Sequence, residues 1–574
     1  MARHQDSTAS EDISSVVQQR VPGTELLFDN GKATAHLQLI PQGDIHILLV
    51  PQPSLSDPND PLRWSTRKKW ATFLNGVAYA FMGSVTGPIM AAGMLPLAET
   101  FGETLQKLSY ANGATLICQG VGNVFWMPLA LKFGRRPVYM LSNVLMGVAC
   151  VWLGVASNAT YTSFIIGRAF LGLFEAPIES IVPTTITDIF FLHDRGEKVS
   201  FYGLSILGGN ELGPLVNNYE LLSDKVKLLT VFVVQFSALI IQRYGIGWAF
   251  YVMAMLICLS CISMFFFMPE TKYTGARPQP FPIPTDIETD EKAGVERIEN
   301  LGIVPNTNRS GYGESIESTP QGPPPRGFIR GLALWEKPDS NVSLKSAFLR
   351  PFVLVTYPTV VWACLVYGAS LGWNVILGAT VAQLFAGQYG FDSQAQGLVF
   401  LSPFVGSLVG SWLCGSLSDS IANYFTKKNE GIREPEMRLP VCVLAIVLTF
   451  LGALMSGLTY HYNTHWAGPV VGYGVLSAGA QMGVSLSMSY ALDCHRELSI
   501  ELMVTVASLK SCMAWVWTWV INDWIDANGM LTVFMVIASI NVAIHLTTLV
   551  LYFRGKSVRI WIVEADILGR CGLK

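Results

Sequence analysis

The chain has 574 residues, of which 51% are hydrophobic and only 14% are charged, and its formal net charge is −3. The mean hydropathy is +0.40. These values exclude an ordinary soluble globular protein of this size, because such proteins carry more charge and less apolar surface. The composition therefore predicts a membrane protein.

Apolar stretches of about 20 residues, long enough to cross the hydrocarbon core, recur about twelve times along the chain. They lie near residues 70–92, 108–131, 137–157, 162–187, 198–241, 247–268, 351–382, 396–416, 439–459, 466–491, 499–521 and 530–553. We predict an all-α membrane protein with 12 transmembrane helices in two six-helix halves, residues 69–268 and 349–553.

Polar segments flank and separate these halves. The N-terminal tail, residues 1–68, begins MARHQDSTASEDISS and lacks the apolar core of a signal peptide, so the first span is expected to direct insertion. Residues 269–348 are rich in Pro, Gly and charge, which predicts a disordered linker. Residues 554–574 form a short C-terminal tail.

Lysine and arginine in the short loops predict that both tails and the linker face the cytoplasm. The outer loops would then carry only Lys107 and Arg243. The inner loops would carry Lys132, Arg135, Arg136, Arg195, Lys198, Lys427, Lys428, Arg433, Arg438 and Arg496. In this orientation Asn158, in an Asn-Ala-Thr sequon, lies outside and is a candidate for glycosylation.

Three ionisable residues share the fourth span. A cation inside a bilayer is costly, so Arg168 is expected to face the interior of the bundle and to find a partner. Glu175 and Glu179 lie on broadly the same helix face as Arg168. Two carboxylates in one cavity repel each other, which raises the proton affinity of at least one of them. A carboxyl group of this kind can bind a proton and a cationic substrate alternately. A purely structural ion pair with Arg168 is the alternative.

Further polar groups lie at similar depth in the second half. Lys510 lies near the middle of span eleven, and Trp373 and Asn374 lie in span seven. Each is a candidate for lining a central cavity, with snorkelling or helix packing as the alternative.

Short motifs recur at the ends of these spans. They read ALKFGRRPVYM after span two, GRAFLGLFEAPIES in span four, GGNELGP in span five, PETKY after span six and GSLSDS after span eight. In this order they resemble the signature motifs of the major facilitator superfamily, and specifically its 12-spanner drug:proton antiporters. The segment PQPSLSDPNDPLRWS resembles the entry segment of fungal members, including those similar to the histidinol and polyamine permease of yeast.

The resemblance implies roles for the loop residues. Gly134, Arg135 and Arg136 would form a tight cytoplasmic turn that latches the inward gate, with simple positive-inside topology as the alternative. The family usually has an Asp three residues before this Gly, where this chain has Leu131, but the second-half counterpart Asp419 keeps its carboxylate.

The span-five motif implies a bend and a close helix contact, through Gly209, Gly213 and Pro214. After its Gly-Pro pair the family continues with two arbitrary residues and two small ones, but here the chain runs into a charged stretch. Removing residues 216–235 restores the pattern, because Leu215 and Phe236 would then precede Ser237 and Ala238. We therefore interpret 216–235 as a possible retained-intron insertion within span five; an outer-face insertion after Pro214 is the alternative.

The sequence favours a secondary active transporter over an enzyme, and we expect proton-coupled export of a small organic molecule, drug or secondary metabolite by alternating access. The alternatives are proton-coupled uptake of organic cations such as polyamines, and a transport-inactive sensor. No phosphate-binding loop for ATP occurs, and no cofactor or metal is expected. We expect a monomer in the plasma membrane, or alternatively the vacuolar membrane, whose partners are substrate, protons and lipid, with no nucleic acid.

Overall fold

A computed structural model describes residues 22–26, 39–42, 45–48, 51–54, 57–215, 245–275, 327, 332–334, 338–339, 342–391, 393–429 and 432–573. The possible insertion, 216–235, and most of the predicted linker lie outside these residues. Eight stretches of the described chain are long and apolar enough to cross a membrane.

The first half is a bundle of long helices. In chain order its elements are η1 (Pro61–Arg63), α2 (Thr66–Thr86), η2 (Pro88–Gly93), α3 (Met94–Phe101), α4 (Leu105–Phe133), α5 (Arg135–Ala156), α6 (Tyr161–Glu175), α7 (Pro177–Ile189), α8 (Leu192–Leu215) and α11 (Ile246–Phe267).

The second half repeats this plan after the linker. Its elements are α14 (Leu344–Leu354), α15 (Pro358–Tyr389), α16 (Ser393–Val399), α17 (Leu401–Lys428), η3 (Pro435–Val441), α18 (Cys442–His461), α19 (Ala467–Cys494), η4 (Arg496–Leu498), α20 (Ser499–Asn528), α21 (Met530–Leu546), α22 (Thr548–Ala565) and α23 (Ile567–Arg570). The predicted linker ends earlier than expected, because α14 already begins at Leu344.

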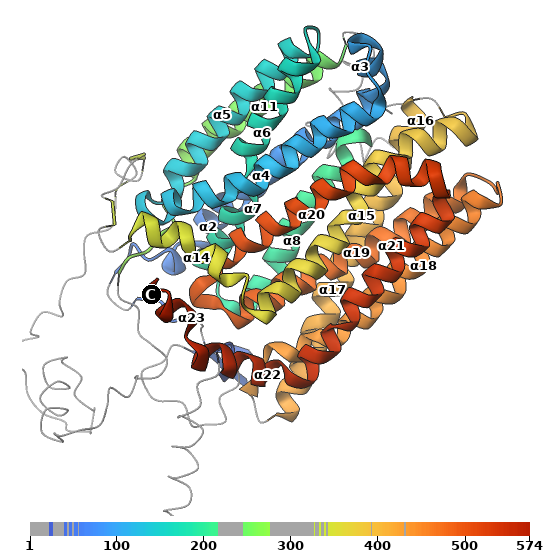
Figure 1. Cartoon of the computed structure of the whole chain (residues 1–574). Helices are drawn as coiled ribbons and strands as arrows, with labels where there is room; N and C mark the ends of the chain where they lie inside the picture. The colour runs from blue at the N-terminus through green and yellow to red at the C-terminus, as the bar shows by residue number, and fades with distance from the viewer. Residues whose placement is uncertain are drawn as a thin grey trace, which may run out of the picture.

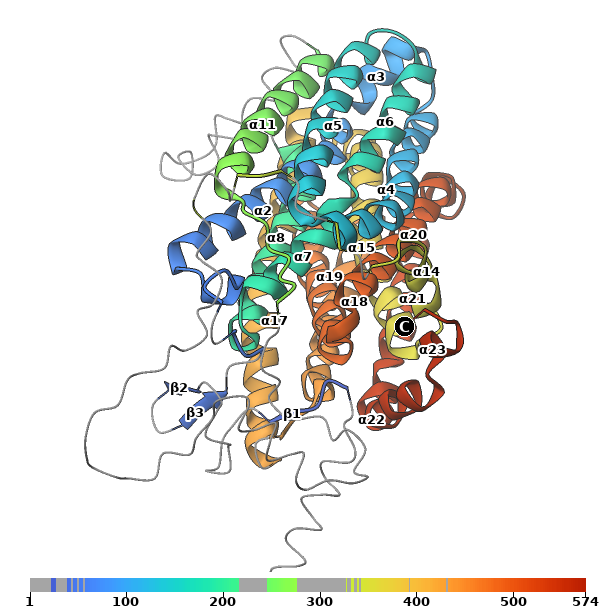
Figure 2. The same ribbon diagram turned by 90° about the vertical axis from the view of Figure 1, so that its left-hand side faces the viewer.

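The two halves lie side by side, and α4 packs on α20 while α8 packs on α17 across their interface (Figure 1). One end of the bundle carries α14, α22 and α23, and we call it the terminal end. Short strands also lie there, and β1, β2 and β3 are labelled in Figure 2. Strand β1 (Glu25–Leu26) pairs with β4 (Ile432–Arg433), and β2 (Leu39–Gln42) pairs with β3 (Ile45–Leu48), both antiparallel.

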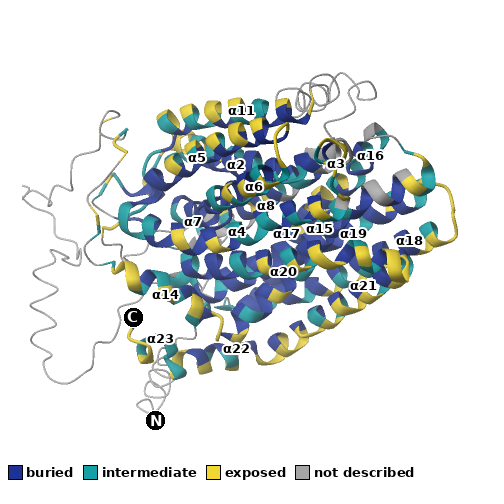
Figure 3. Ribbon diagram, turned by 45° about the horizontal axis from the view of Figure 1, so that its top comes forward, coloured by how far each residue is buried: buried dark blue, intermediate teal, exposed yellow. Residues whose placement is uncertain are grey.

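The outer faces of the bundle are apolar. On α11, Met255 and Leu259 are each 63% exposed, and the exposed positions of the ribbon lie on the outer side of the bundle (Figure 3). A soluble monomer rarely exposes so much contiguous apolar surface, whereas lipid covers it without cost. The outward face is therefore the lipid face.

The predicted fourth span is not one continuous helix. Helix α6 ends at Glu175 and α7 begins at Pro177, because proline has no N–H to donate to the preceding turn. This break separates two residues that were expected to share one regular helix face, Glu175 and Glu179.

Candidate functional site

A cavity of about 130 Å³ lies between the two halves. Residues of α2, η2, α4, α6, α7 and α8 line it from the first half, and residues of α15, α17 and α20 line it from the second. It reaches toward the end of the bundle opposite the terminal end, where Pro88, Met90 and Pro403 line it. A cavity of this size, lined by both halves, has room for a small organic group.

Glu175 and Arg168 are linked through one residue of another helix. The hydroxyl of Thr86, at the end of α2, donates to Glu175 Oε2 at 2.8 Å, and the Thr86 carbonyl accepts from Arg168 Nη1 at 3.0 Å. Arg168 Nη2 also donates to the Gly87 carbonyl and to Asn112 Oδ1. Glu175 lines the cavity, whereas Arg168 is fully buried outside its lining. Arg168 thus fixes the chain around Thr86.

Glu179 pairs with Lys510 across the interface between the halves. Both side chains are buried and both line the cavity. The ammonium of Lys510 also lies 5.0 Å from the ring centroid of Tyr367 on α15. The second carboxylate oxygen of Glu179 is buried and has no hydrogen-bond partner among the described residues. Glu179 is therefore paired through one of its two carboxylate oxygens.

A third carboxylate, Glu211 on α8, lines the same cavity and was not among the residues singled out from the sequence. Its Oε1 accepts from the Ser407 hydroxyl of α17 at 2.8 Å and from the Ser477 hydroxyl of α19 at 3.3 Å. Its Oε2 is buried without a hydrogen-bond partner among the described residues. The signal that could have found it is the one used for Glu175, an acidic residue inside an apolar span.

The structure separates the two neighbouring candidates of span seven. Asn374 lines the cavity. Trp373 is fully buried outside the cavity lining, and its ring meets that of Phe534 edge-on at 5.5 Å. Adjacent residues on a helix point about 100° apart, so only one of them can face the cavity squarely.

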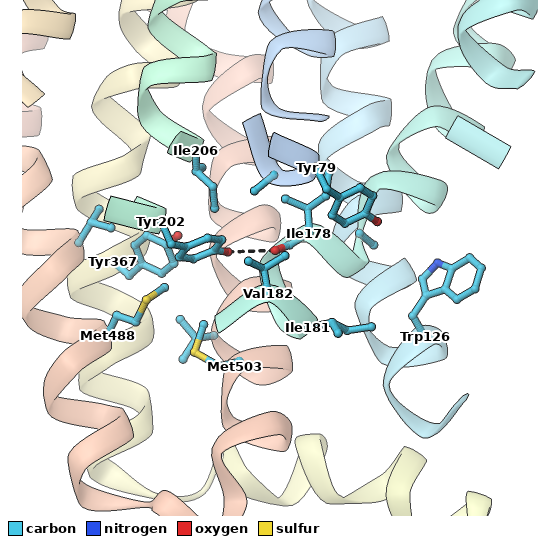
Figure 4. Close-up of a cluster of buried hydrophobic side chains, with 14 of the residues drawn as sticks. Tyr79, Trp126, Ile178, Ile181, Val182, Tyr202, Ile206, Tyr367, Met488 and Met503 are labelled. Carbon is cyan, nitrogen blue, oxygen red and sulfur yellow. Dashed lines mark hydrogen bonds between the residues drawn. The ribbon is translucent and has the colours of Figure 1, made fainter. Parts of the chain in front are cut away.

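Apolar side chains close the cavity toward the terminal end. We call Ile178, Val182, Tyr202, Tyr367, Met488 and Met503 the apolar floor; they belong to one cluster of buried residues and come from both halves (Figure 4). The Tyr202 hydroxyl of α8 donates to the Ile178 carbonyl of α7 at 3.0 Å. The site is therefore closed on this side in the structure.

The GRR turn lies at the terminal end beside the start of the linker. Gly134 has a φ of +97°, which favours glycine. The backbone N–H groups of Arg135 and Arg136 each donate to the carboxylate of Glu270 at 3.0 Å, and the Arg135 guanidinium pairs with Asp188 at the end of α7. The turn thus binds the ends of α7 and α11, all within the first half.

The second half has a corresponding set of ion pairs. Asp419, in the second half of α17, lies 3.3 Å from Arg438 and 3.6 Å from Arg433. Arg438 in turn lies 3.3 Å from Asp493 at the end of α19. In the first half, Leu131 occupies the position that corresponds to Asp419, and Arg135 pairs with Asp188 of α7 instead.

These features can now be compared with known proteins. A family model described as the Major Facilitator Superfamily matches residues 72–515. The chain belongs to this superfamily. An uncharacterised MFS-type transporter of Schizosaccharomyces pombe is 24% identical to it, with 95% of this chain and 93% of the relative covered. Protein HOL1 of Saccharomyces cerevisiae is 23% identical, with 90% of each chain covered.

Two further matches extend the comparison. The MFS-type transporter penM of Penicillium rubens is 26% identical, with 79% of this chain and 78% of penM covered. The solved structure of the proton:xylose symporter XylE matches with a TM-score of 0.56 at 13% identity, covering 84% of this chain and 96% of XylE. The predicted major facilitator fold is thereby confirmed, and this chain is a transporter, not an enzyme.

The span-five motif and the Asn158 sequon also have defined places in the major facilitator fold. Gly209 lies where α8 meets α2, and a Cβ added there would be 2.7 Å from Ser84 Cβ, so only glycine allows this approach. Gly213 and Pro214 lie in the last turn of α8. Asn158 is exposed in the turn between α5 and α6, at the end of the bundle away from the GRR turn.

Proposed function

We propose that this major facilitator protein is a proton-coupled secondary transporter that exports a small organic molecule, such as a drug or a secondary metabolite. The observation that carries the proposal is the charge of the cavity between the halves. Three buried carboxylates, Glu175, Glu179 and Glu211, face one ammonium group, that of Lys510. A cavity with an excess of buried acid groups favours protons and organic cations as occupants.

Exchange follows if a proton and a cationic substrate compete for the same carboxylate. A proton that enters Glu175 or Glu179 would release the cation, and loss of that proton would allow the next cation to bind. Alternating exposure of the cavity by rocking of the two halves would then convert inward proton flow into outward substrate flow. This scheme agrees with the resemblance to drug:proton antiporters and with an orientation in which the terminal end faces the cytoplasm.

One observation favours uptake as a second candidate. Glu211 has its partners on α17 and α19, whereas Glu179 has its partner on α20. Separate acidic sites allow a proton and a cation to bind at the same time, which is the requirement for symport. The resemblance of the segment before the first span to the histidinol and polyamine permease of yeast is compatible with this candidate.

The decisive variant is Glu175→Gln, which keeps the shape and the hydrogen bond from Thr86 but cannot ionise. We expect it to abolish proton-driven transport while surface expression stays intact. Glu103→Gln is a matched control, because Glu103 lies in an exposed pair with Lys107. Full activity of Glu175→Gln would remove Glu175 from the mechanism.

Direction and substrate class are tested by one screen. Cells with and without the gene are compared for accumulation of, and resistance to, a panel of cationic and neutral compounds. Export predicts lower accumulation and higher resistance in cells that carry the gene. Higher accumulation of cations would instead select the uptake candidate.

A further inference from the structure

The N-terminal tail is docked on the second half at the terminal end. Residues Glu25 and Leu26 pair in antiparallel register with Arg433 and Ile432 of β4, in the connection between α17 and α18 (Figure 2). The tail thus adds a strand to an edge that belongs to a distant part of the chain. Strand addition of this kind is a general way to bind a peptide segment.

A buried arginine completes the docking site. Arg559 on α22 is fully buried, and its Nε and Nη2 donate to the two carboxylate oxygens of Glu436 at 2.9 and 2.7 Å. Its Nη1 donates to the Pro22 carbonyl at 2.5 Å and to Thr24 Oγ1 at 3.1 Å. Because a buried guanidinium group needs acceptors for all its N–H groups, the tail satisfies donors that Glu436 leaves free.

The fit of the tail depends on one glycine. Gly23 has a φ of +82°, and a Cβ added there would lie 2.6 Å from the Asp493 carbonyl oxygen and 3.0 Å from Pro435. Any other residue at this position would adopt an unfavourable backbone conformation, and its Cβ would clash with Asp493 and Pro435. The segment matches its site in conformation as well as in hydrogen bonds.

The docked segment touches the ion pairs that join α17 to α19. Its strand partner Arg433 lies near Asp419, and its Gly23 contacts Asp493, the acid that pairs with Arg438. Met488 of the apolar floor lies on α19 shortly before Asp493. The tail therefore supports the second-half wall of the floor.

The same tail is also anchored on the first half. The Ser54 N–H donates to Asp60 Oδ2 at 2.9 Å, and the Leu62 carbonyl accepts from Lys69 Nζ of α2 at 2.9 Å. The η1 turn that follows Asp60 packs on α7, the first-half side of the floor. One tail thus contacts both halves at the end that the floor closes.

We propose that residues 22–26 are a docking peptide acting within its own chain. They occupy a site formed by β4, Pro435, Asp493 and Arg559, and their docking favours the state in which the terminal end is closed. Release of the peptide frees the end of α19 and lets the floor open. The inference goes beyond the proposed function, because it depends on neither the substrate nor the coupling ion.

Docking is tested by a disulfide between Leu26→Cys and Ile432→Cys in the full chain, in membrane vesicles. Paired residues of antiparallel strands have Cα atoms about 4.5–5.5 Å apart, within the range that a disulfide spans. Leu26→Cys with Lys427→Cys is the control, because Lys427 is exposed at the end of α17 and is not a strand partner. Mass spectrometry of the digested protein should find the first disulfide and not the second. Equal yields from both pairs would overturn the docking.

The effect on closure is tested by labelling Met488→Cys with a maleimide. Gly23→Ala should raise the labelling rate of this cysteine by roughly three- to tenfold, because it removes a few hydrogen bonds that favour the closed state. Thr24→Ser, which keeps the hydroxyl, should label like the parent protein. Site-resolved mass spectrometry separates this cysteine from the native ones.

The disulfide variant gives a second measurement of closure, and this measurement does not depend on whether the Gly23→Ala variant folds. In a protein that carries Met488→Cys together with Leu26→Cys and Ile432→Cys, the oxidised form should be labelled at position 488 more slowly than the reduced form. Equal labelling rates of the oxidised and reduced forms would overturn the role of the tail in closure, even if the docking itself is observed.

Discussion

Glu179 and Lys510 form an ion pair whose partners belong to different halves, and their side chains are only 8% and 2% exposed. Removing one partner of a buried pair leaves an uncompensated charge, which costs about 3–5 kcal/mol. We expect Lys510→Met to lower the thermal unfolding midpoint of the purified protein in detergent. Glu179→Gln with Lys510→Met should recover most of the loss, because neither charge then remains.

An exposed pair provides the control for this cycle. Lys107 pairs with Glu103 at 2.6 Å, but its side chain is 50% exposed. Lys107→Met should change the free energy of unfolding by less than about 1 kcal/mol. A double variant at Glu179 and Lys510 that is as unstable as Lys510→Met alone would contradict a stabilising role for the pair.

Glu211 is the residue of the cavity that joins α8 to two helices of the other half. Glu211→Gln keeps an acceptor for Ser407 and Ser477 but loses the charge, so we expect the transport rate to fall by roughly tenfold or more with surface expression unchanged. Ser411→Ala is the control, because Ser411 lies one turn after Ser407 on α17 and bonds to Gln481 instead. Wild-type transport by Glu211→Gln would limit Glu211 to a structural role.

Much of the site follows from one sequence rule, which is that a charge inside an apolar span needs a polar environment. The rule points to Arg168, Glu175, Glu179 and Lys510, and the structure places the last three at one cavity. It does not identify the partners. Arg168 was expected to find a partner of unspecified kind, and it binds the backbone carbonyls of Thr86 and Gly87 and the side-chain amide of Asn112.

At the scale of elements, the close contact of α8 with α2 depends on Gly209. A Cβ at this position would lie 2.7 Å from Ser84 Cβ and 3.1 Å from the Phe81 carbonyl oxygen. We expect Gly209→Ala to destabilise the protein by about 1–3 kcal/mol, because the two helices must move apart. The thermal unfolding midpoint in detergent measures this change.

A second glycine separates this steric effect from helix propensity. Gly387 lies in α15, and a Cβ added there meets no atom within 4 Å. Gly387→Ala should leave stability unchanged or raise it slightly, since alanine is the better helix former. A loss of stability in Gly387→Ala equal to that in Gly209→Ala would refute the contact argument.

Element positions are largely predictable from hydropathy, but breaks within elements are not. The predicted span 162–187 corresponds to two helices, α6 and α7, with a break before Pro177. Proline inside a span does not always end a helix, because Pro128 lies within α4 and Pro183 within α7. The packing of neighbouring helices decides between these outcomes, and hydropathy carries no information about it.

At the scale of the whole molecule, the direction of the helices restricts what residues 216–235 can be. Helix α8 runs away from the terminal end, and α11 begins beside the turn after α5, where a Cβ on Gly247 would contact Ser157 and the Gly154 carbonyl. The end of α8 and the start of α11 therefore lie at the same end of the bundle. A chain that crossed the membrane once between them would have to begin and end at opposite ends of the bundle, so these two positions do not fit a single additional span.

The retained-intron hypothesis leads to a prediction for the shortened chain. Deleting residues 216–235 joins Leu215 to Phe236 and extends α8 with Ser237 and Ala238, two small residues suited to a helix contact. We expect the shortened protein to give a higher yield of monodisperse material than the full chain, since it no longer places charged residues within a span. Size-exclusion chromatography of both proteins, fused to a fluorescent reporter, measures this difference.

Deletion of 20 residues from the linker is the matched control, because a loss of chain length there should not change the yield. Sequencing of the transcript across Leu215 and Phe236 tests the hypothesis independently of folding. Abundant mRNA that contains the segment, together with equal yields of the two proteins, would establish it as a genuine part of the transporter. Its place would then be an insertion after Pro214 at the end of the bundle opposite the terminal end, where α8 ends and α11 begins.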